Sequence, residues 1–154
     1  MFSLPFSVNK IYPLSGERYA LTMTTDTQKN PARYHVLEEV PYCSNGHGLT
    51  AGQRTGLYIY DEKTGNLQKL TEEHADAGDF VYRNGILLFQ ATPWENYRTY
   101  LYGHGLYTYQ VDSGEVRQIV RVGRINSFAL CFWKEDELLF SGIEDCLGKS
   151  MGQN

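Results

Sequence analysis

GLYIYDEKTGNLQKLT, residues 56–71, is the stretch that decides the fold, because it returns 49 residues later as GLYTYQVDSGEVRQIV, residues 105–120. Self-similarity at a fixed period is the signature of repeat architectures. Each copy begins with a strand-like run of alternating aliphatic and aromatic residues, passes through a polar turn and continues with a second alternating run, as an antiparallel pair of strands does. Gly65 and Gly114 supply the positive φ that such turns require. Each copy therefore predicts a β-hairpin.

Side chains alternate between the two faces of a strand. In the first copy Leu57 and Ile59 are therefore predicted on one face, with Tyr58 and Tyr60 on the other.

A second kind of hairpin precedes each copy, and a further one follows the second copy. Asn84-Gly85 is the strongest short turn signal in the chain, since a type I′ turn needs positive φ at both central residues. The three turns of this kind are predicted at Ser15-Gly16, Arg83-Asn84-Gly85 and Lys134-Glu135-Asp136. Two hairpins of roughly 50 residues together make one propeller blade. We predict an all-β fold, a partial β-propeller of two four-stranded antiparallel blades plus the first hairpin of a third.

The whole chain, 1–154, is expected to form this partial propeller. Blade 1 is predicted at about 6–71 with an insertion at 24–55, blade 2 at 77–120, the first half of blade 3 at 126–142 and a tail at 143–154. Propellers have four to eight blades, so this chain is expected to be incomplete as a functional unit and to have open strand edges.

Composition excludes several classes of function. Fourteen Lys and Arg against eighteen Asp and Glu give a net charge of −4 with the signs interspersed, so no nucleic-acid partner is expected. No apolar run is long enough for a membrane span and no signal peptide is recognisable, which predicts a cytoplasmic protein without a membrane partner. Cys43, Cys131 and Cys146 are odd in number and widely spaced, as reduced thiols are.

Two segments between strands are candidates for binding. Insertions in repeat proteins map to loops on one face, often the binding face. The insertion at 24–55 and the loop at 93–103 carry the residues that we predict to contact a substrate or an interface, namely Tyr42, His47, Trp94, Tyr97 and Tyr100. Packing between blades for the aromatic residues, and a plain loop position for His47, are the alternative interpretations.

The sequence contains no complete catalytic apparatus, so no catalytic residue is predicted. GKSMG at 148–152 matches the nucleophile-elbow pattern, but only Gln153 and Asn154 follow the motif, and the elbow needs Asp and His later in the chain. The carboxylates Glu72, Glu73, Asp76 and Asp79 invite a cation, yet a solvated loop is the favoured interpretation. No metal and no cofactor is predicted.

The order of several short motifs resembles a known family. These motifs are EEVPY at 38–42, NGHGLT at 45–50, Arg54 and LYIYD at 57–61. They resemble the first-blade region of prolyl oligopeptidase family serine peptidases of the acylaminoacyl-peptidase-like or dipeptidyl-aminopeptidase-like branch, and the match runs to about Ser141. Tyr42 and Cys43 stand where bulkier aromatic residues are more usual, and LSGE at 14–17 replaces a Ser-Pro-Asp-Gly turn.

This resemblance implies a function for the chain as part of a larger protein. The parent would carry a C-terminal α/β-hydrolase domain with a Ser-Asp-His triad, absent from this chain, and the propeller would gate the access of peptide substrates to it. The partner is then that hydrolase domain, with the peptide contacted only indirectly. The alternative is a stand-alone protein-interaction module that completes its ring by self-association.

Overall fold

The computed structural model describes residues 7–26, 43–44, 48–49, 53–73, 75–95, 98–99, 105–120, 125–132, 134 and 137–144. These residues form strands joined by turns, and among them is no helix long and apolar enough to cross a membrane. The chain divides into two compact units, Met1–Ala77 with Pro93–Thr99 and Gly78–Thr92 with Tyr100–Asn154.

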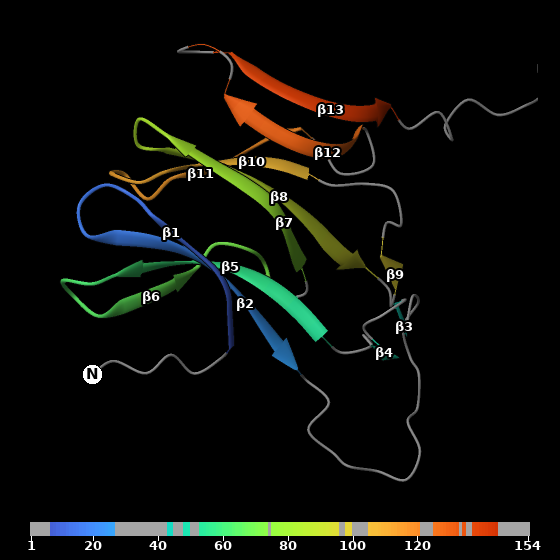
Figure 1. The fold of residues 1–154 in the computed structure, drawn as a ribbon, viewed down its shortest axis with the longest axis horizontal. Coiled ribbons are helices and arrows are strands. Elements are labelled where there is room, and N and C mark those ends of the chain that lie inside the picture. The colour runs from blue at the N-terminus through green and yellow to red at the C-terminus, as the bar shows by residue number, and fades with distance from the viewer. Residues whose placement is uncertain are drawn as a thin grey trace, which may run out of the picture. The chain divides into compact units, whose positions relative to one another are not determined.

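The first sheet has four antiparallel strands in the order β1-β2-β5-β6 (Figure 1). The strands are β1 (Ser7–Pro13), β2 (Arg18–Asp26), β5 (Gln53–Asp61) and β6 (Asn66–Lys69). Tyr58 lies opposite Leu21 on β2, which places the tyrosines of β5 on the face that carries Leu21 and Met23. That face forms a core of Leu21, Met23 and Tyr58, and Val8, Tyr19, Tyr60 and Leu67 pack around it.

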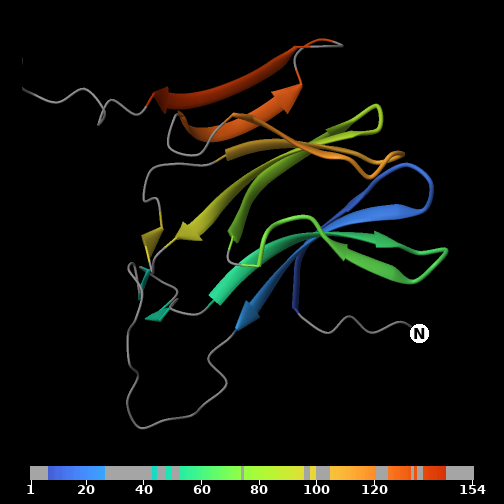
Figure 2. The same ribbon diagram turned by 180° about the vertical axis from the view of Figure 1, so that it is seen from behind.

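Both hairpin turns of the first sheet lie at the same end, which we call its turn end (Figures 1 and 2). The β1–β2 turn has positive φ at Gly16 and Glu17, with values of 68° and 59°. The amide of Glu62 donates to the carbonyl of Glu17 at 3.0 Å and ties the two turns together. The opposite end, where residues 27–52 connect β2 to β5, we call the loop end.

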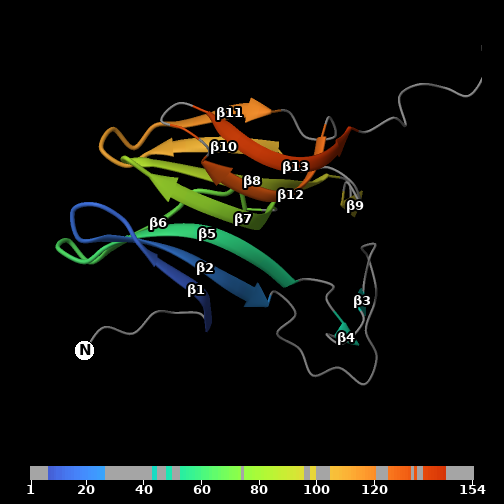
Figure 3. The same cartoon turned by 45° about the horizontal axis from the view of Figure 1, so that its top comes forward.

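The second sheet repeats this plan in the order β11-β10-β8-β7 (Figure 3). Its strands are β7 (Ala75–Arg83), β8 (Ile86–Glu95), β10 (Gly105–Gln110) and β11 (Val116–Val120), and the short β9 (Arg98–Thr99) pairs with the end of β8. The predicted turn at Asn84-Gly85 is confirmed, with φ of 49° and 80°. The amide of Val111 donates to the carbonyl of Gly85 at 2.9 Å, as Glu62 does to Glu17 in the first sheet.

Register makes the two sheets comparable residue by residue. Arg18 pairs with Asp61 in the first sheet, and Ile86 pairs with Gln110 in the second. The offsets are therefore 68 for the first hairpins (86 − 18) and 49 for the second hairpins (110 − 61). They differ by 19 residues, the extra length of the connection between β2 and β5.

A last hairpin joins β12 (Ile125–Phe132) to β13 (Leu138–Glu144), and a two-residue ladder joins β3 (Cys43–Ser44) to β4 (Gly48–Leu49). The predicted fold class is confirmed, because two four-stranded antiparallel sheets are followed by one further hairpin. The second unit has its own core of Leu88, Leu106 and Leu130, against which Val81, Val120 and Phe132 pack. This core joins β12 to the second sheet.

A glycine beneath a tyrosine is the local feature that both sheets share. A Cβ built on Gly56 would lie 2.6 Å from Cε2 of Tyr58, and one on Gly105 would lie 2.6 Å from Cε2 of Tyr107. Residues i and i+2 share a strand face, so each ring folds back over the bare glycine two residues earlier. The sequence Gly-Leu-Tyr thus recurs because the tyrosine occupies the space that a side chain at the glycine would need.

The strand boundaries differ from those that the sequence suggested in two places. β7 begins at Ala75, two residues before the predicted start of blade 2 at 77. β2 runs to Asp26 and β5 begins at Gln53, which leaves 27–52 as the connecting segment.

Candidate functional site

The loop end of the first sheet is the candidate site, because the long connection 27–52 leaves from it and returns to it. A β-bulge in β1 shapes this end: Val8 pairs with Met23 and Lys10 with Thr22, so Asn9 is the extra residue. Nδ2 of Asn9 donates to Oγ1 of Thr24 at 2.7 Å. The bulge thus brings the amide side chain of Asn9 to Thr24 on β2.

The hydrogen bonds continue from β2 to β5 and on to the start of β7. The hydroxyl groups of Thr24 and Thr55 form a hydrogen bond with their oxygens 3.0 Å apart, and the amide of Thr55 donates to Oδ1 of Asp76 at 2.7 Å. β6 pairs only with residues 58–61 of β5, so the amides nearer the loop end need other acceptors. Asp76 accepts from Thr55, and Oγ1 of Thr71 accepts from Leu57 at 3.3 Å.

The two ends of the long connection are held beside each other. Asp26 pairs with Gln53, and Oγ1 of Thr25 donates to the carbonyl of Arg54 at 3.2 Å. Nη1 of Arg54 donates to the carbonyl of Gln53 at 2.6 Å. The arrangement is a rigid, polar base from which residues 27–52 extend, and it contains no nucleophile paired with a base among the residues described.

The corresponding end of the second sheet is built differently. Oε1 of Gln90 accepts from the amide of Asp79 at 3.0 Å, and the side chain of Gln90 fills the space over Gly78. Gln90 and Thr92 are both buried. Trp94 lies in β8 opposite Thr99.

Of the predicted contact residues, Tyr42, His47, Tyr97 and Tyr100 lie outside the described residues, as does Ser150. Their proposed role stays a prediction. The structure adds the positions of the segments that carry these residues. Residues 27–52 connect β2 to β5 in the first sheet, and residues 96–104 connect the equivalent strands β8 and β10 in the second, at the equivalent end of each sheet.

Two of the four carboxylates at 72–79, those of Asp76 and Asp79, accept hydrogen bonds from backbone amides. Asp76 accepts from the amide of Thr55, and Oδ1 of Asp79 accepts from the amide of Phe80 at 2.9 Å. Within the described ranges, no three His, Cys, Asp or Glu side chains are grouped so that they could hold a metal ion.

The turn end of the first sheet carries polar contacts that the sequence did not reveal. Oδ1 of Asp61 accepts from the amide of Thr64 at 2.9 Å, and this bond is the largest cause of a lowered pKa of Asp61. The hydroxyl of Tyr19 donates to Oε2 of Glu62 at 2.9 Å, which raises the pKa of Tyr19. Arg18 lies 3.6 Å from Asp61 across the strand pair. Cross-strand register brings Arg18 to Asp61 and Tyr19 close to Glu62, whereas the contact between Asp61 and Thr64 is local to the β5–β6 turn.

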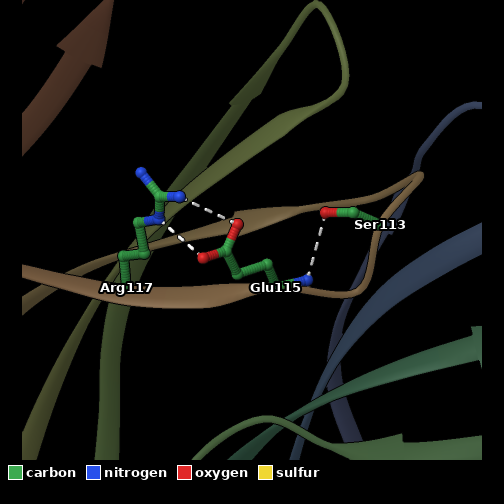
Figure 4. Close-up of polar contacts among 3 residues, drawn as sticks. All are labelled: Ser113, Glu115 and Arg117. Atoms are coloured by element: carbon green, nitrogen blue, oxygen red, sulfur yellow. Dashed lines mark hydrogen bonds and ion pairs between the residues drawn. The ribbon is translucent and has the colours of Figure 1, made fainter.

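The edge strand β11 carries an exposed ion pair (Figure 4). Nε and Nη2 of Arg117 bind the two carboxylate oxygens of Glu115 at 2.7 and 3.1 Å, and the amide of Glu115 donates to Oγ of Ser113 at 3.3 Å. Exposed pairs of this kind contribute little to stability. Charges on an edge strand do discourage pairing with another chain.

No protein-family model and no curated protein sequence matches the chain. Its fold is similar to that of a solved structure, the acylaminoacyl peptidase of Pyrococcus horikoshii, with a TM-score of 0.54 and 11% sequence identity. The similarity covers 79% of this chain and 19% of that one. The chain thus spans about a fifth of the protein it resembles, and at this identity the similarity establishes the fold alone.

Proposed function

We propose that the chain is a non-catalytic propeller segment of a prolyl oligopeptidase family peptidase and gates peptide access to a hydrolase domain outside this chain. The observation that carries the proposal is the fold match to part of an acylaminoacyl peptidase over 79% of the chain. The order of the motifs at 38–61, found independently in the sequence, supports the same family.

The division between rigid sheets and connecting segments supports a gating role. The hydrogen bonds from Asn9 through Thr24 and Thr55 to Asp76 fix the base of residues 27–52. Function in repeat proteins sits on loops that a rigid scaffold positions. In this proposal the segments 27–52 and 96–104 contact the peptide, and the sheets hold them in place.

Gating is tested in the native gene product with two substrates that differ in size. Trp94→Ala and Tyr97→Ala should change KM for a peptide of ten or more residues several-fold and leave hydrolysis of a chromogenic acyl-amino-acid substrate within twofold. Val116→Ala, an exposed residue on β11, is the matched control and should change neither. Equal effects on both substrates, or none on either, would refute gating, and the isolated chain should hydrolyse neither substrate.

A second candidate function, a stand-alone module that completes its ring by self-association, is favoured by a different observation. Large apolar side chains are exposed on the first sheet and on the last hairpin, at Ile11 and Leu139. Sedimentation of the isolated chain between 1 and 100 µM tests it. A discrete oligomer supports self-association, and a monomer throughout that range refutes it.

A further inference from the structure

The last hairpin repeats the first one, and this allows their exposures to be compared. Ile11 pairs with Leu21 and Leu130 pairs with Phe140, an offset of 119 at both positions (130 − 11 and 140 − 21). The bulges agree as well, since one falls between Val8 and Lys10 and the other between Ser127 and Ala129. Ile11 and Leu130 therefore occupy the same place in the two hairpins.

These two equivalent residues have opposite environments. Leu130 is only 7% exposed, because it packs in one core with Leu88 and Leu106 of the second sheet. Ile11 is 59% exposed. We call the side of a sheet or hairpin that carries Ile11 or Leu130 its front face. The front face of the last hairpin is covered, whereas the front face of the first sheet exposes an isoleucine.

The opposite side, which we call the back face, shows the reverse pattern. Ala20, Leu88 and Leu139 are equivalent by the offsets of 68 and 119. Ala20 is 0% exposed and Leu88 is 1% exposed, but Leu139 is 53% exposed. Cys131, the cross-strand neighbour of Leu139, is exposed as well. The last hairpin therefore has an open back face.

The second unit contains an example of how a front face and a back face fit together. Leu130 and Phe132 of the hairpin pack against Leu88 and Val81 of the second sheet. The Arg83 guanidinium lies 5.6 Å from the centre of the Phe132 ring, and its Nη1 donates to the carbonyl of Lys134 at 2.8 Å. Front-to-back packing with a polar clamp at the turn is thus a contact that this chain already makes.

On the front face of the first sheet Leu21 and Met23 of β2 are buried, and the exposure is confined to β1 at Ile11. We propose that a second copy of this chain covers this exposed part of β1 and the open back face of the last hairpin. The back face of β12–β13 in one copy, with Leu139, docks on the front face of β1–β2 in the next, with Ile11. Such a contact joins two different surfaces, so copies add head to tail and form a ring if the rotation closes. The inference rests on the self-association function above and specifies its surfaces. Self-association is the alternative to the peptidase proposal.

Cross-linking between copies tests the register of this contact. In a background in which Cys43, Cys131 and Cys146 are serine, the variants Ile11→Cys and Leu139→Cys are prepared separately, mixed and oxidised. A matched control replaces Leu139→Cys by Ile119→Cys, which is also exposed but lies on β11. The 11–139 heterodimer should form at least tenfold faster than the 11–119 heterodimer.

Sedimentation of charge variants gives the second measurement. Because Ile11 and Leu139 are exposed, Ile11→Asp and Leu139→Asp should keep the far-UV circular dichroism spectrum and abolish association. Ile119→Asp should leave association unchanged. A chain that forms oligomers with equal cross-linking at both positions would overturn the proposed surfaces but not self-association. A monomer at 100 µM would overturn both, and neither result would affect the peptidase proposal.

Discussion

Replacing Gly105 by alanine should destabilise the chain, although alanine is usually better than glycine in a strand. Removal of a glycine from the interior of a strand gains about 0.5–1 kcal/mol, because the unfolded chain becomes less free. The new Cβ would lie 2.6 Å from Cε2 of Tyr107, whereas ordinary contact begins at 3.4 Å, so the ring must retreat by about 0.8 Å.

The surroundings of Tyr107 oppose that movement. The ring stacks on Phe89 with centroids 5.3 Å apart, and Phe89 is itself buried. The hydroxyl of Tyr107 also accepts from Nε2 of Gln118 at 3.0 Å. Overpacking of this kind costs about 1–3 kcal/mol. The net effect of Gly105→Ala is therefore a loss of about 1 kcal/mol.

A double-mutant cycle separates the clash from any effect on the backbone. In a Tyr107→Thr background the space over Gly105 is free, and Gly105→Ala should there stabilise by about 0.5–1 kcal/mol. Gly114→Ala is the matched control, because Gly114 has φ of 73° and nothing within 4 Å of a built Cβ. It should cost about 1–2 kcal/mol in both backgrounds.

Urea unfolding followed by far-UV circular dichroism measures the four free energies. The expected coupling between positions 105 and 107 is about 1–3 kcal/mol. A Gly105→Ala variant more stable than the parent, or a coupling below about 0.5 kcal/mol, would refute the interpretation that the tyrosine occupies the place of a glycine side chain.

Three further predictions concern single contacts. Asp76→Ala should lower the free energy of unfolding by about 1–3 kcal/mol, because the Thr55 amide loses its acceptor, whereas Asp76→Asn should lower it much less. Urea unfolding of both variants measures the two losses, and equal losses would contradict the prediction. Arg83→Ala should lower the free energy of unfolding by about 1–2 kcal/mol and speed hydrogen exchange in β12, because the contacts of Arg83 with Phe132 and Lys134 are lost. Unchanged exchange in β12 would show that these contacts do not stabilise that strand. The pKa of Asp61 is lowered in the folded state, so the stabilisation that this carboxylate gives is present above the unfolded pKa near 3.8 and is lost as pH falls through the folded pKa. Asp61→Asn should therefore weaken the dependence of the melting temperature on pH below about pH 4. An unchanged dependence would argue against the Thr64 contact as the cause of the lowered pKa.

The sequence predicted most of the fold, because the repeat and the turn chemistry are local. The matching 16-residue stretches gave the second hairpin of each sheet, and Asn84-Gly85 gave a turn whose positive φ values are confirmed. The start of β7 was missed. Its first residues are polar and lack alternation, and Asp76 is held there by its contact with Thr55, more than 20 residues earlier in the chain.

The candidate site was predicted only as a pair of segments. The sequence indicated the segments 24–55 and 93–103 as candidates for binding. It did not predict the hydrogen bonds at the loop end of the first sheet, because these depend on cross-strand register. Asn9, for instance, reaches Thr24 because a bulge inserts one residue, and no pattern in SVNKIYP announces that bulge. The exposure of Ile11 could not be predicted either, because its cross-strand neighbour Leu21 is apolar as well and is buried.

The intact mass of the native gene product, captured from its source with an antibody to this segment, tests the proposed function most directly. A mass several-fold above 17.6 kDa, with acyl-peptide hydrolysis in the captured material, is the expected result for a propeller segment of a larger peptidase. A mass of 17.6 kDa would contradict that account, and the self-associating module would then be the function to pursue.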